Sequence, residues 1–427
     1  MRTDLGRRDF LKASGAAAAA SLLPGCVTPS ESAKPLGRVV VIGGGYGGAT
    51  AAKYLRLWGA GAIEVLLVER NTEFVSCPTS NLVLGGSRTL ADITRGYAKL
   101  RDYGVRLVHD EATAINAGRK SVSLKRGEDL AYDRLIVSPA VDLMFEQIEG
   151  YGPEAQKTAL TAWKAGPETL GLRRQLEAMP DGGVFIIAVP RTPYRCPPGP
   201  YERACQVAFY FKQAKPRSKV LVLDANEDVA SKPALFKAAW NDLYKGVIEY
   251  RNNTEVRALD ARAMTVKTDF DTIKGDVLNV LPPMRAGEIA RTAGLMTGNT
   301  RWCGVDWLTM ESVAHKNIHV LGDATLSAPA MPKSGHMANN HAKVAAAAII
   351  ELMNGREPDP NPVIANTCYS YVSDKEVIHV ASVHRYDPAQ KTMVVAPGAS
   401  GVSAARSELE GAYGWAWAQN IWSDMLG

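Results

Sequence analysis

A glycine-rich turn near the start of the chain carries the first residues that could do chemistry. Gly43, Gly45 and Gly48 form a Gly-x-Gly-x-x-Gly pattern. They directly follow an apolar run, residues 39–42, that is typical of a buried strand. The first glycine permits a tight turn, the second lets the backbone approach a pyrophosphate, and the third lets the next helix pack closely on the strand. The spacing therefore predicts a dinucleotide site with its pyrophosphate at a helix N-terminus, where unpaired N–H groups favour negative charge.

A carboxylate after the next predicted strand strengthens this interpretation. Residues 63–68 are apolar enough for a second buried strand, and Glu69 follows them directly. At that position the carboxylate can accept hydrogen bonds from an adenosine ribose. The glycine pattern alone would be a weak signal, so the pairing with Glu69 is what favours a nucleotide.

The second place where a glycine turn is expected holds prolines instead. Residues 183–189 are typical of a buried strand, but residues 190–200 read Pro-Arg-Thr-Pro-Tyr-Arg-Cys-Pro-Pro-Gly-Pro. Proline fixes φ and has no N–H to donate, so this loop cannot cradle a pyrophosphate as a glycine turn does. A further strand over residues 219–223 indicates that the scaffold of a second nucleotide-binding domain is kept. We expect nicotinamide binding to be lost.

Six cysteines supply the sulfur chemistry that the chain could support. They are Cys26, Cys77, Cys196, Cys205, Cys303 and Cys368. No Cys-x-x-Cys pair and no Cys/His spacing suitable for zinc occurs in the sequence, so we expect no metal site. In an oxidising compartment some of the five cysteines beyond the N-terminal segment should pair. Their spacing leaves the pairing open.

A strand that ends in Gly-Asp resembles a flavin contact. Residues 317–324 read Asn-Ile-His-Val-Leu-Gly-Asp-Ala, which places Asp323 at the end of a strand. In FAD enzymes with two dinucleotide domains, which this arrangement resembles, the corresponding aspartate hydrogen-bonds the ribityl chain. An alanine-rich helix predicted over residues 342–353 would direct its positive N-terminal end toward the flavin.

The whole pattern predicts an α/β fold of two Rossmann-like dinucleotide-binding domains followed by a C-terminal α+β domain. The expected boundaries are residues 1–33 for a signal and linker, 36–150 and 276–355 for the two parts of the FAD-binding domain, 151–275 for the second Rossmann-like domain, and 356–427 for the C-terminal domain. We expect a helix over residues 92–103. A meander of short strands should follow at residues 105–110, 113–116 and 121–124. Residues 276–282 should return the chain to the first domain.

The N-terminus resembles an export signal. Arg7-Arg8-Asp-Phe-Leu-Lys precedes an alanine-rich apolar segment, as in twin-arginine signals that carry folded proteins to the periplasm. Cys26 could accept a lipid, but the neighbouring Pro24 favours a soluble mature protein. The net charge of +5 is spread over interspersed acidic and basic residues, so a nucleic-acid partner is not expected. No window beyond the N-terminus is long enough for a transmembrane segment.

Several segments together resemble the flavoprotein subunits of flavocytochrome c sulfide dehydrogenase. They are the twin-arginine signal, Gly-Gly-Gly-Tyr-Gly-Gly-Ala-Thr-Ala-Ala-Lys-Tyr-Leu, Ser-Cys77-Pro-x-Ser-Asn, Tyr-Arg-Cys196-Pro-Pro-Gly-Pro-Tyr-Glu-Arg, the Gly-Asp segment and Asn-Thr-Cys368-Tyr-Ser. The resemblance runs from about residue 7 to the C-terminus. It implies an FAD attached through its 8α-methyl group to Cys77, and a redox disulfide between Cys196 and Cys368 beside the flavin. It also implies sulfide as substrate and a heme-carrying cytochrome c subunit as partner.

The implied chemistry suits these residue types. Hydrosulfide is a soft nucleophile that can attack a disulfide by exchange, which leaves a persulfide on one cysteine and a thiolate on the other. We expect Cys196 to carry the persulfide and Cys368 to pass electrons to the flavin, although the sequence does not order the two roles. Cys303 is the second candidate partner of Cys196, and Cys205 is expected to be a buried free thiol. Heme must come from another chain, because no Cys-x-x-Cys-His occurs.

Other functions are compatible with parts of the pattern. Sulfide:quinone oxidoreductase shares the fold and the cysteine pair, but the export signal and Cys77 argue against it. The aromatic segment 413–422 could touch a membrane interface, yet packing on the parent domain is the more common role of such a segment. The missing second glycine turn disfavours an NADH-dependent disulfide reductase or type II NADH dehydrogenase. A flavin-free binding protein is disfavoured by the intact glycine pattern, Glu69 and Asp323.

Overall fold

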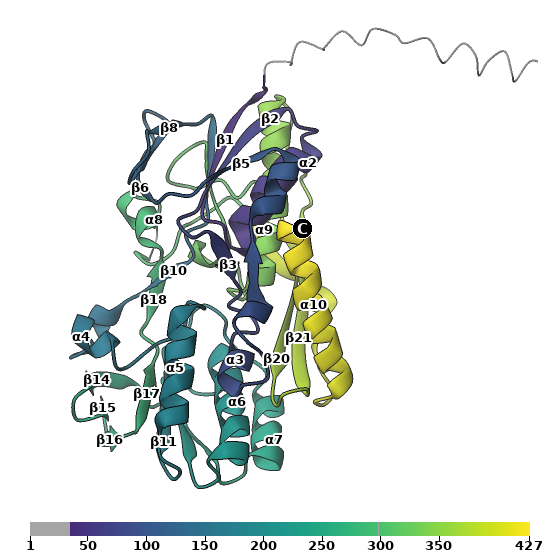
Figure 1. Cartoon of the computed structure of the whole chain (residues 1–427). Coiled ribbons are helices and arrows are strands. Elements are labelled where there is room, and N and C mark those ends of the chain that lie inside the picture. Colours follow the sequence, from purple (N-terminus) through teal and green to yellow (C-terminus); the bar gives the residue numbers. More distant parts are fainter. Residues whose placement is uncertain (1–34, 298) are drawn as a thin grey trace, which may run out of the picture. The chain divides into compact units, whose positions relative to one another are not determined.

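The computed structural model describes residues 35–297 and 299–427, and most of its long-range strand pairing lies in two parallel sheets (Figure 1). The first sheet has the order β19-β9-β1-β2-β5. Its strands, in that order, are Ile318–Val320, Arg134–Val137, Gly37–Ile42, Ile63–Val68 and Val105–Val108. Every neighbouring pair in it is parallel. The valines of β1 are fully buried, since layers on both faces cover a parallel sheet.

Helix α2 (Tyr46–Trp58) follows β1 and makes a close contact that only glycine permits. A Cβ added at Gly48 would lie 1.8 Å from the carbonyl oxygen of Gly43. Gly43 itself has a φ of +92°, in the left-handed region that glycine enters without strain. The third glycine of the pattern therefore sets how closely the helix approaches the turn.

We expect Gly48→Ala to destabilise the flavin-free protein by about 1–3 kcal/mol or more, because its methyl group would overlap the Gly43 carbonyl oxygen. Urea unfolding followed by tryptophan fluorescence measures the loss. Gly45→Ala is the matched control, since its added Cβ would meet no atom within 4 Å among the described residues. Equal unfolding midpoints for Gly48→Ala and the unmodified protein would contradict this role.

Helix α9 (Gly335–Met353) packs against α2 and is longer than the sequence indicated. The expected start was residue 342. The helix begins at Gly335 instead, because the Ser334 hydroxyl caps it by accepting a hydrogen bond from the Met337 N–H at 3.0 Å. Asn339 and His341 look like loop residues in the sequence, but both are buried in the first turns of this helix.

The segment between β2 and β9 differs from its prediction in two respects. Residues 92–103 are not one helix: two short 3₁₀ turns, Ala91–Ile93 and Ala98–Tyr103, flank strand β4 (Thr94–Gly96). β4 forms because it pairs with β3 (Glu73–Val75), a partner that local sequence does not reveal. The strand expected over residues 105–110 is β5 at the edge of the parallel sheet, not part of a meander. The meander consists of β6 (Ala112–Asn116), β7 (Ser121–Leu124) and β8 (Leu130–Ala131).

The second parallel sheet has the order β13-β12-β11-β17. Its strands, in that order, are Ile248–Arg251, Lys219–Asp224, Val184–Val189 and Val277–Val280. Helices α5 (Pro167–Ala178), α6 (Gly199–Ala214) and α7 (Pro233–Leu243) pack around it, and β14 (Val256–Asp260), β15 (Thr265–Thr268) and β16 (Thr272–Lys274) form a small antiparallel sheet beside it. The helices α3 (Asn81–Gly85), α4 (Pro153–Gln156) and α8 (Glu288–Thr292) are short.

The chain returns to the first domain later in the sequence than expected. Residues 276–282 were assigned to this return, but β17 pairs with β11 and completes the second sheet. All four residues of β17 are buried although it is the edge strand of this sheet, and the pairing with β11 that places it there cannot be read from its own sequence. The crossing is made by β18 (Met284–Ala286), which pairs with β10 (Val141–Leu143).

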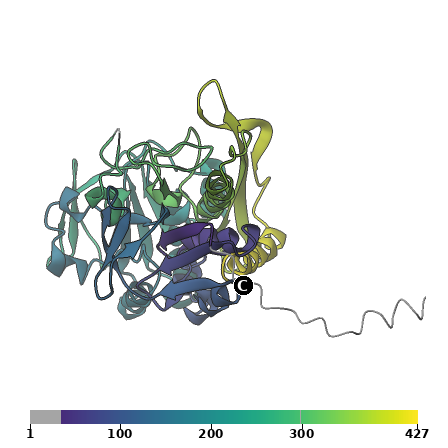
Figure 2. The ribbon, with the colours of Figure 1, turned by 90° about the horizontal axis from the view of Figure 1, so that it is seen from above.

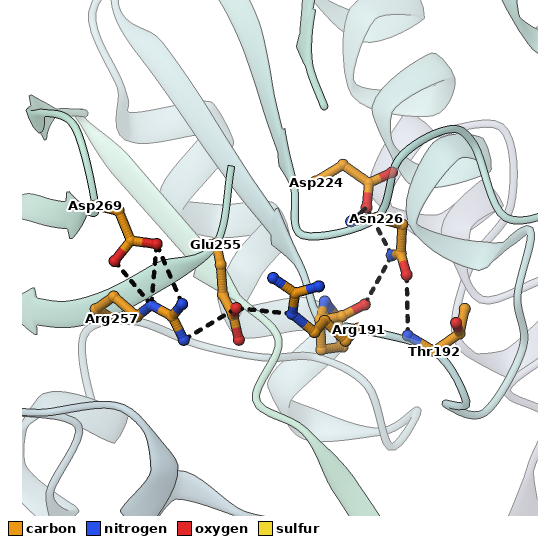
Figure 3. Close-up of polar contacts among 8 residues, drawn as sticks. Arg191, Thr192, Asp224, Asn226, Glu255, Arg257 and Asp269 are labelled. Atoms are coloured by element: carbon orange, nitrogen blue, oxygen red, sulfur yellow. Dashed lines mark hydrogen bonds and ion pairs between the residues drawn. The ribbon is translucent and has the colours of Figure 1, made fainter. Parts of the chain in front are cut away.

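Asp224 is the last residue of β12 (Figure 3). In a second dinucleotide-binding domain, this is the position of the carboxylate that binds the ribose. Asp224 is fully buried and accepts hydrogen bonds from the Tyr201 hydroxyl at 2.7 Å and the Tyr250 hydroxyl at 3.1 Å. Asn226 donates to it as well and also accepts from the Thr192 N–H, which fixes the proline-rich loop. Internal donors thus already hold this carboxylate, and the loss of nicotinamide binding stays a prediction.

The C-terminal part is an antiparallel sheet with one long helix. The strands are β20 (Val363–Tyr371), β21 (Val377–Asp387) and β22 (Thr392–Val402), and the β21–β22 hairpin curves away from the helices (Figure 2). Helix α10 (Glu408–Leu426) contains the aromatic segment. Trp422 is buried, and its indole N–H donates to the Tyr46 hydroxyl at 3.1 Å, so the segment packs on its parent domain as expected. Among the described residues no helix has the length and apolarity to cross a membrane.

Candidate functional site

A cavity of about 1060 Å³ collects the predicted site residues from both sheets and from the C-terminal part. Its volume lies just above the usual range for pockets that hold small molecules and cofactors, about 300–1,000 Å³. The predicted residues that line it are Gly43, Gly45, Glu69, Cys77, Cys196, Asp323 and Cys368. Gly48 is the exception, because it lies behind Gly43 where the helix packs on the turn.

The glycine turn presents backbone donors to one end of the cavity. Gly45 is the N-cap of α2 and offers no side chain to satisfy the first N–H groups of this 13-residue helix. Glu69 holds the turn in place: one carboxylate oxygen accepts from the Gly44 N–H at 2.7 Å and the other from the Asn71 N–H at 2.8 Å. A helix N-terminus with unpaired N–H groups binds phosphate groups well. This end of the cavity is therefore suited to a pyrophosphate.

Asp323 lies in the wall of the same cavity with an unpaired oxygen. Its Oδ1 is buried and has no hydrogen-bond partner within the described part of the chain. Burial raises the pKa of this carboxyl, while the nearby Arg195 and Lys333 lower it. A buried acceptor without a donor costs about 1–3 kcal/mol, so a hydroxyl-rich ligand would relieve it. The glycine cradle, Glu69 and the open acceptor of Asp323 together fit FAD, whose ribityl chain carries such hydroxyls.

A buried histidine fixes the turn that carries Asp323. Gly322 has a φ of +67°, and its N–H donates to Nδ1 of His341 at 3.2 Å. Burial lowers the pKa of His341 to about 3, so the ring is neutral and its Nδ1 can accept. His341 also packs edge-to-face on Trp307. This histidine therefore orients the Gly-Asp turn rather than carrying charge.

We expect the free energy of unfolding to fall as the pH drops below about 6.5. The His341 side chain is protonated in the unfolded state at that pH, whereas burial keeps it neutral in the folded state. Each pH unit costs about 1.4 kcal/mol per such group, so His341 alone removes about 2 kcal/mol between pH 6.5 and pH 5. Urea unfolding at pH 7 and pH 5 measures the difference. His341→Gln should reduce the pH dependence by about that amount, and an unchanged dependence in this variant would contradict the assignment.

Cys196 and Cys368 reach the cavity from different elements. Cys196 lies in the loop between β11 and α6, with a left-handed φ of +60°, and its N–H donates to the Lys333 carbonyl at 2.8 Å. Cys368 lies within β20, with its Sγ 3.3 Å from Nδ2 of Asn366. Burial raises the pKa of Cys196 most, and Cys368 raises it further. Both are thiols in the structure, as are the other cysteines of the described residues, so the disulfide stays a prediction.

The other cysteines have separate positions. Cys77 is partly exposed on the cavity wall, and its Sγ accepts from the Ala165 N–H at 3.5 Å. Cys205 is the buried free thiol that the sequence predicted, and Trp240 donates to its sulfur at 3.3 Å. Cys303 is buried, with its pKa raised to about 12 by burial, and is not among the described residues that line the cavity. Cys368 is therefore better placed than Cys303 as a partner of Cys196.

A buried network of hydrogen bonds at the cavity, centred on Asn81, escaped the sequence analysis. Arg203 on α6 is 2% exposed and donates to Oδ1 of Asn81 at 3.0 Å and to the Thr161 carbonyl at 2.7 Å. Glu202 lines the cavity, where it accepts from Nδ2 of Asn81 at 2.9 Å and from the Tyr371 N–H at 2.9 Å. Both residues belong to the motif that follows Cys196. Their position in that motif was the available signal, but their burial depends on long-range packing.

Family models match most of the chain. The pyridine nucleotide-disulphide oxidoreductase model matches residues 37–161. The model of the central part of the sulfide dehydrogenase (flavocytochrome c) flavoprotein chain matches residues 169–282, and the flavin-binding model of flavocytochrome c sulphide dehydrogenase matches residues 360–426. A twin-arginine translocation signal model matches residues 4–24, which confirms the predicted export route to the periplasm. That segment and Cys26 lie outside the described residues.

Individual relatives agree with these models. The sulfide dehydrogenase (flavocytochrome c) flavoprotein chain of Chlorobaculum thiosulfatiphilum is 61% identical over 46 residues, 11% of this chain and 94% of that sequence. The mitochondrial sulfide:quinone oxidoreductase of Dictyostelium discoideum is 24% identical over 302 residues, 68% of this chain and 66% of that protein. The chain thus spans slightly less than two thirds of that relative.

The fold has a counterpart among solved structures. The crystal structure of sulfide:quinone oxidoreductase from Aquifex aeolicus superposes with a TM-score of 0.72 at 20% identity over 91% of both chains. This likeness and the two parallel sheets confirm the predicted α/β fold with Rossmann-like domains. The family models and the 61% identical relative go further: the chain belongs to the flavoprotein chains of flavocytochrome c sulfide dehydrogenase, which are FAD-dependent oxidoreductases.

Proposed function

We propose that this chain oxidises sulfide through a Cys196–Cys368 disulfide and FAD, and passes the electrons to a cytochrome c subunit. The observation that carries the proposal is the cavity itself. Two cysteines that are far apart in the sequence line one cavity together with Asp323 and the glycine turn. A soft sulfur nucleophile and a flavin would therefore meet in the same space.

The first step is thiol–disulfide exchange at the cysteine pair. Hydrosulfide attacks one sulfur, a new S–S bond forms as the Cys196–Cys368 bond breaks, and the products are a persulfide on one cysteine and a thiolate on the other. The charge balances, because the negative charge of hydrosulfide passes to the released thiolate. We assign the persulfide to Cys196 and the released thiolate to Cys368. Both sulfurs lie on the cavity wall, which leaves them open to a small anion.

The rest of the cavity holds the cofactor. FAD, when bound, supplies an acceptor for the electron pair of the thiolate that can release electrons one at a time. The turn at Gly43 to Gly45 would bind the pyrophosphate, Glu69 would bind the adenosine ribose, and Asp323 would accept a hydrogen bond from a ribityl hydroxyl. We propose that Cys77, which lines the same cavity, forms the covalent link to the flavin. Such a link would keep the cofactor on an exported protein.

The partner in this proposal is a heme-carrying cytochrome c subunit. The relative from Chlorobaculum thiosulfatiphilum, which is named as a flavoprotein chain of flavocytochrome c, supports it. Quinone is the second candidate acceptor, because the Dictyostelium discoideum relative is a sulfide:quinone oxidoreductase. The export signal favours the cytochrome, since the mature protein would act in the periplasm.

An acceptor assay tests the proposed function. The purified holoenzyme is mixed anaerobically with sulfide, and bleaching of the flavin's visible absorbance is followed. The reduced enzyme is then offered cytochrome c or a soluble quinone in separate reactions. We expect bleaching by sulfide and reoxidation by cytochrome c. A flavin that sulfide does not bleach would overturn the proposal, and reoxidation by quinone alone would replace the cytochrome with quinone.

A further inference from the structure

Lys232, which precedes helix α7 beside the second sheet, contacts β20, the strand that carries Cys368. Lys232 is the N-cap residue of α7 and is only 6% exposed. Its Nζ donates to Oγ of Ser370 at 3.1 Å and lies 3.4 Å from the Cys368 carbonyl oxygen. Both acceptors belong to β20. A cation from one part of the fold therefore anchors a catalytic strand from another.

The backbone at Lys232 is held in an uncommon conformation. Its φ of +57° and ψ of 45° lie in the left-handed region, which non-glycine residues seldom occupy. Cys196 shares this property with a φ of +60°. Strained residues of this kind persist where the surrounding structure fixes them, and they cluster at functional sites. Both residues belong to the second sheet's part of the chain, and twelve other non-glycine residues among those described also have a positive φ.

The charges around Lys232 are mostly negative or able to become so. They come from four elements: Cys196 in the loop before α6, Glu202 on α6, Cys368 on β20 and Glu410 on α10. Burial lowers the pKa of Lys232, whereas these groups raise it. In return, Lys232 and Arg195 are the cations that lower the pKa of Cys196. Lys232 is not among the described residues that line the cavity, so its charge acts from behind the cysteines.

We propose that Lys232 is the positioning residue of the cysteine pair: it anchors β20 through the Ser370 hydroxyl and the Cys368 carbonyl, and it keeps a buried positive charge at the strand that carries Cys368. When the pair is reduced, this charge favours the thiolate form of Cys196. The proposal rests on the proposed function for the identity of the reaction. The charge on a cysteine sulfur can nevertheless be measured without sulfide, so the two ideas can fail separately.

The test is the pH dependence of thiol alkylation in the reduced holoenzyme. Iodoacetamide is applied over a range of pH, and mass spectrometry of the Cys196 peptide gives the midpoint of its reactivity. Lys232→Met removes the charge but keeps most of the side chain. We expect the Cys196 midpoint to rise by about one pH unit, equivalent to about tenfold less thiolate at a fixed pH. Lys232→Arg should restore the midpoint because it keeps the charge.

Lys237→Met is the matched control, since Lys237 is on the same helix, is 45% exposed and pairs with Asp228 on the surface. Its Cys196 midpoint should equal that of the unmodified enzyme. If Lys232→Met does not fold, Lys232→Gln gives the same measurement with a polar neutral side chain. An unchanged midpoint in a folded neutral variant overturns the proposal. A shifted midpoint in an enzyme that sulfide does not reduce keeps this proposal and refutes the proposed sulfide reaction instead.

Discussion

Cys196→Ser and Cys368→Ser should each abolish reduction of the flavin by sulfide while the flavin stays bound. A serine hydroxyl cannot form the disulfide or accept hydrosulfide by exchange, so the first chemical step has no electrophilic sulfur. Both side chains line the cavity at partly exposed positions, so replacing one sulfur by oxygen should leave the fold intact. We expect the rate of flavin bleaching to fall on the order of 10³-fold or more, as when a covalent catalyst is removed.

Stopped-flow absorbance with anaerobic sulfide measures this loss, and a chemical reductant that acts directly on the flavin shows that the cofactor remains competent. Cys205→Ser is the matched control, because Cys205 is fully buried against Trp240 and is not among the described residues that line the cavity. Its rate should stay near that of the unmodified enzyme. Normal reduction in either cavity variant would rule out the disulfide mechanism.

Cys77→Ser should release the flavin when the protein is denatured in acid. In the unmodified enzyme we expect flavin fluorescence to migrate with the polypeptide on a denaturing gel, because a thioether survives unfolding. In the variant the fluorescence should leave the chain almost completely. Cys77 lines the cavity that would hold the flavin, and its sulfur accepts a hydrogen bond from the Ala165 N–H at 3.5 Å.

The Cys77→Ser protein should still bind FAD non-covalently under native conditions, since the glycine turn, Glu69 and Asp323 are unchanged in it. Gel filtration with absorbance detection checks this retention. Cys368→Ser serves as the control for a second cavity cysteine and should keep its fluorescent band. If the flavin separates from both the unmodified chain and the variant, the covalent link does not exist, and quinone then becomes the first acceptor to test.

Local sequence determined the nucleotide-binding part of this protein. The glycine turn, the strand before it and Glu69 lie within about thirty consecutive residues, so each piece of the geometry follows from its neighbours. The strand β19 was predicted for the same reason; it ends at Val320, and Asp323 lies in the short 3₁₀ turn that follows it. The replacement of a second glycine turn by prolines was also visible in the sequence, and in the structure Asn226 holds that loop next to Asp224 (Figure 3).

Other features depended on partners that are distant in the sequence. β4 forms only because β3 lies beside it, and β17 joins the second sheet by pairing with β11. Helix α9 starts at Gly335 because its polar residues find buried partners, such as Thr50, which accepts from Nδ2 of Asn339 at 2.9 Å. Propensity and periodicity describe a segment by itself, so they placed these boundaries wrongly.

The cysteine site shows the same division. The sequence singled out Cys196 and Cys368 through the motifs around them, but their spacing alone left the pairing open. Only the tertiary structure placed both on one cavity wall, with Lys232 and Glu202 nearby and Cys303 elsewhere. Contacts between residues so far apart are decided by how the sheets and helices pack. The sequence by itself therefore determined the cofactor fold and the reactive residue types, while the tertiary structure decided which of those residues meet.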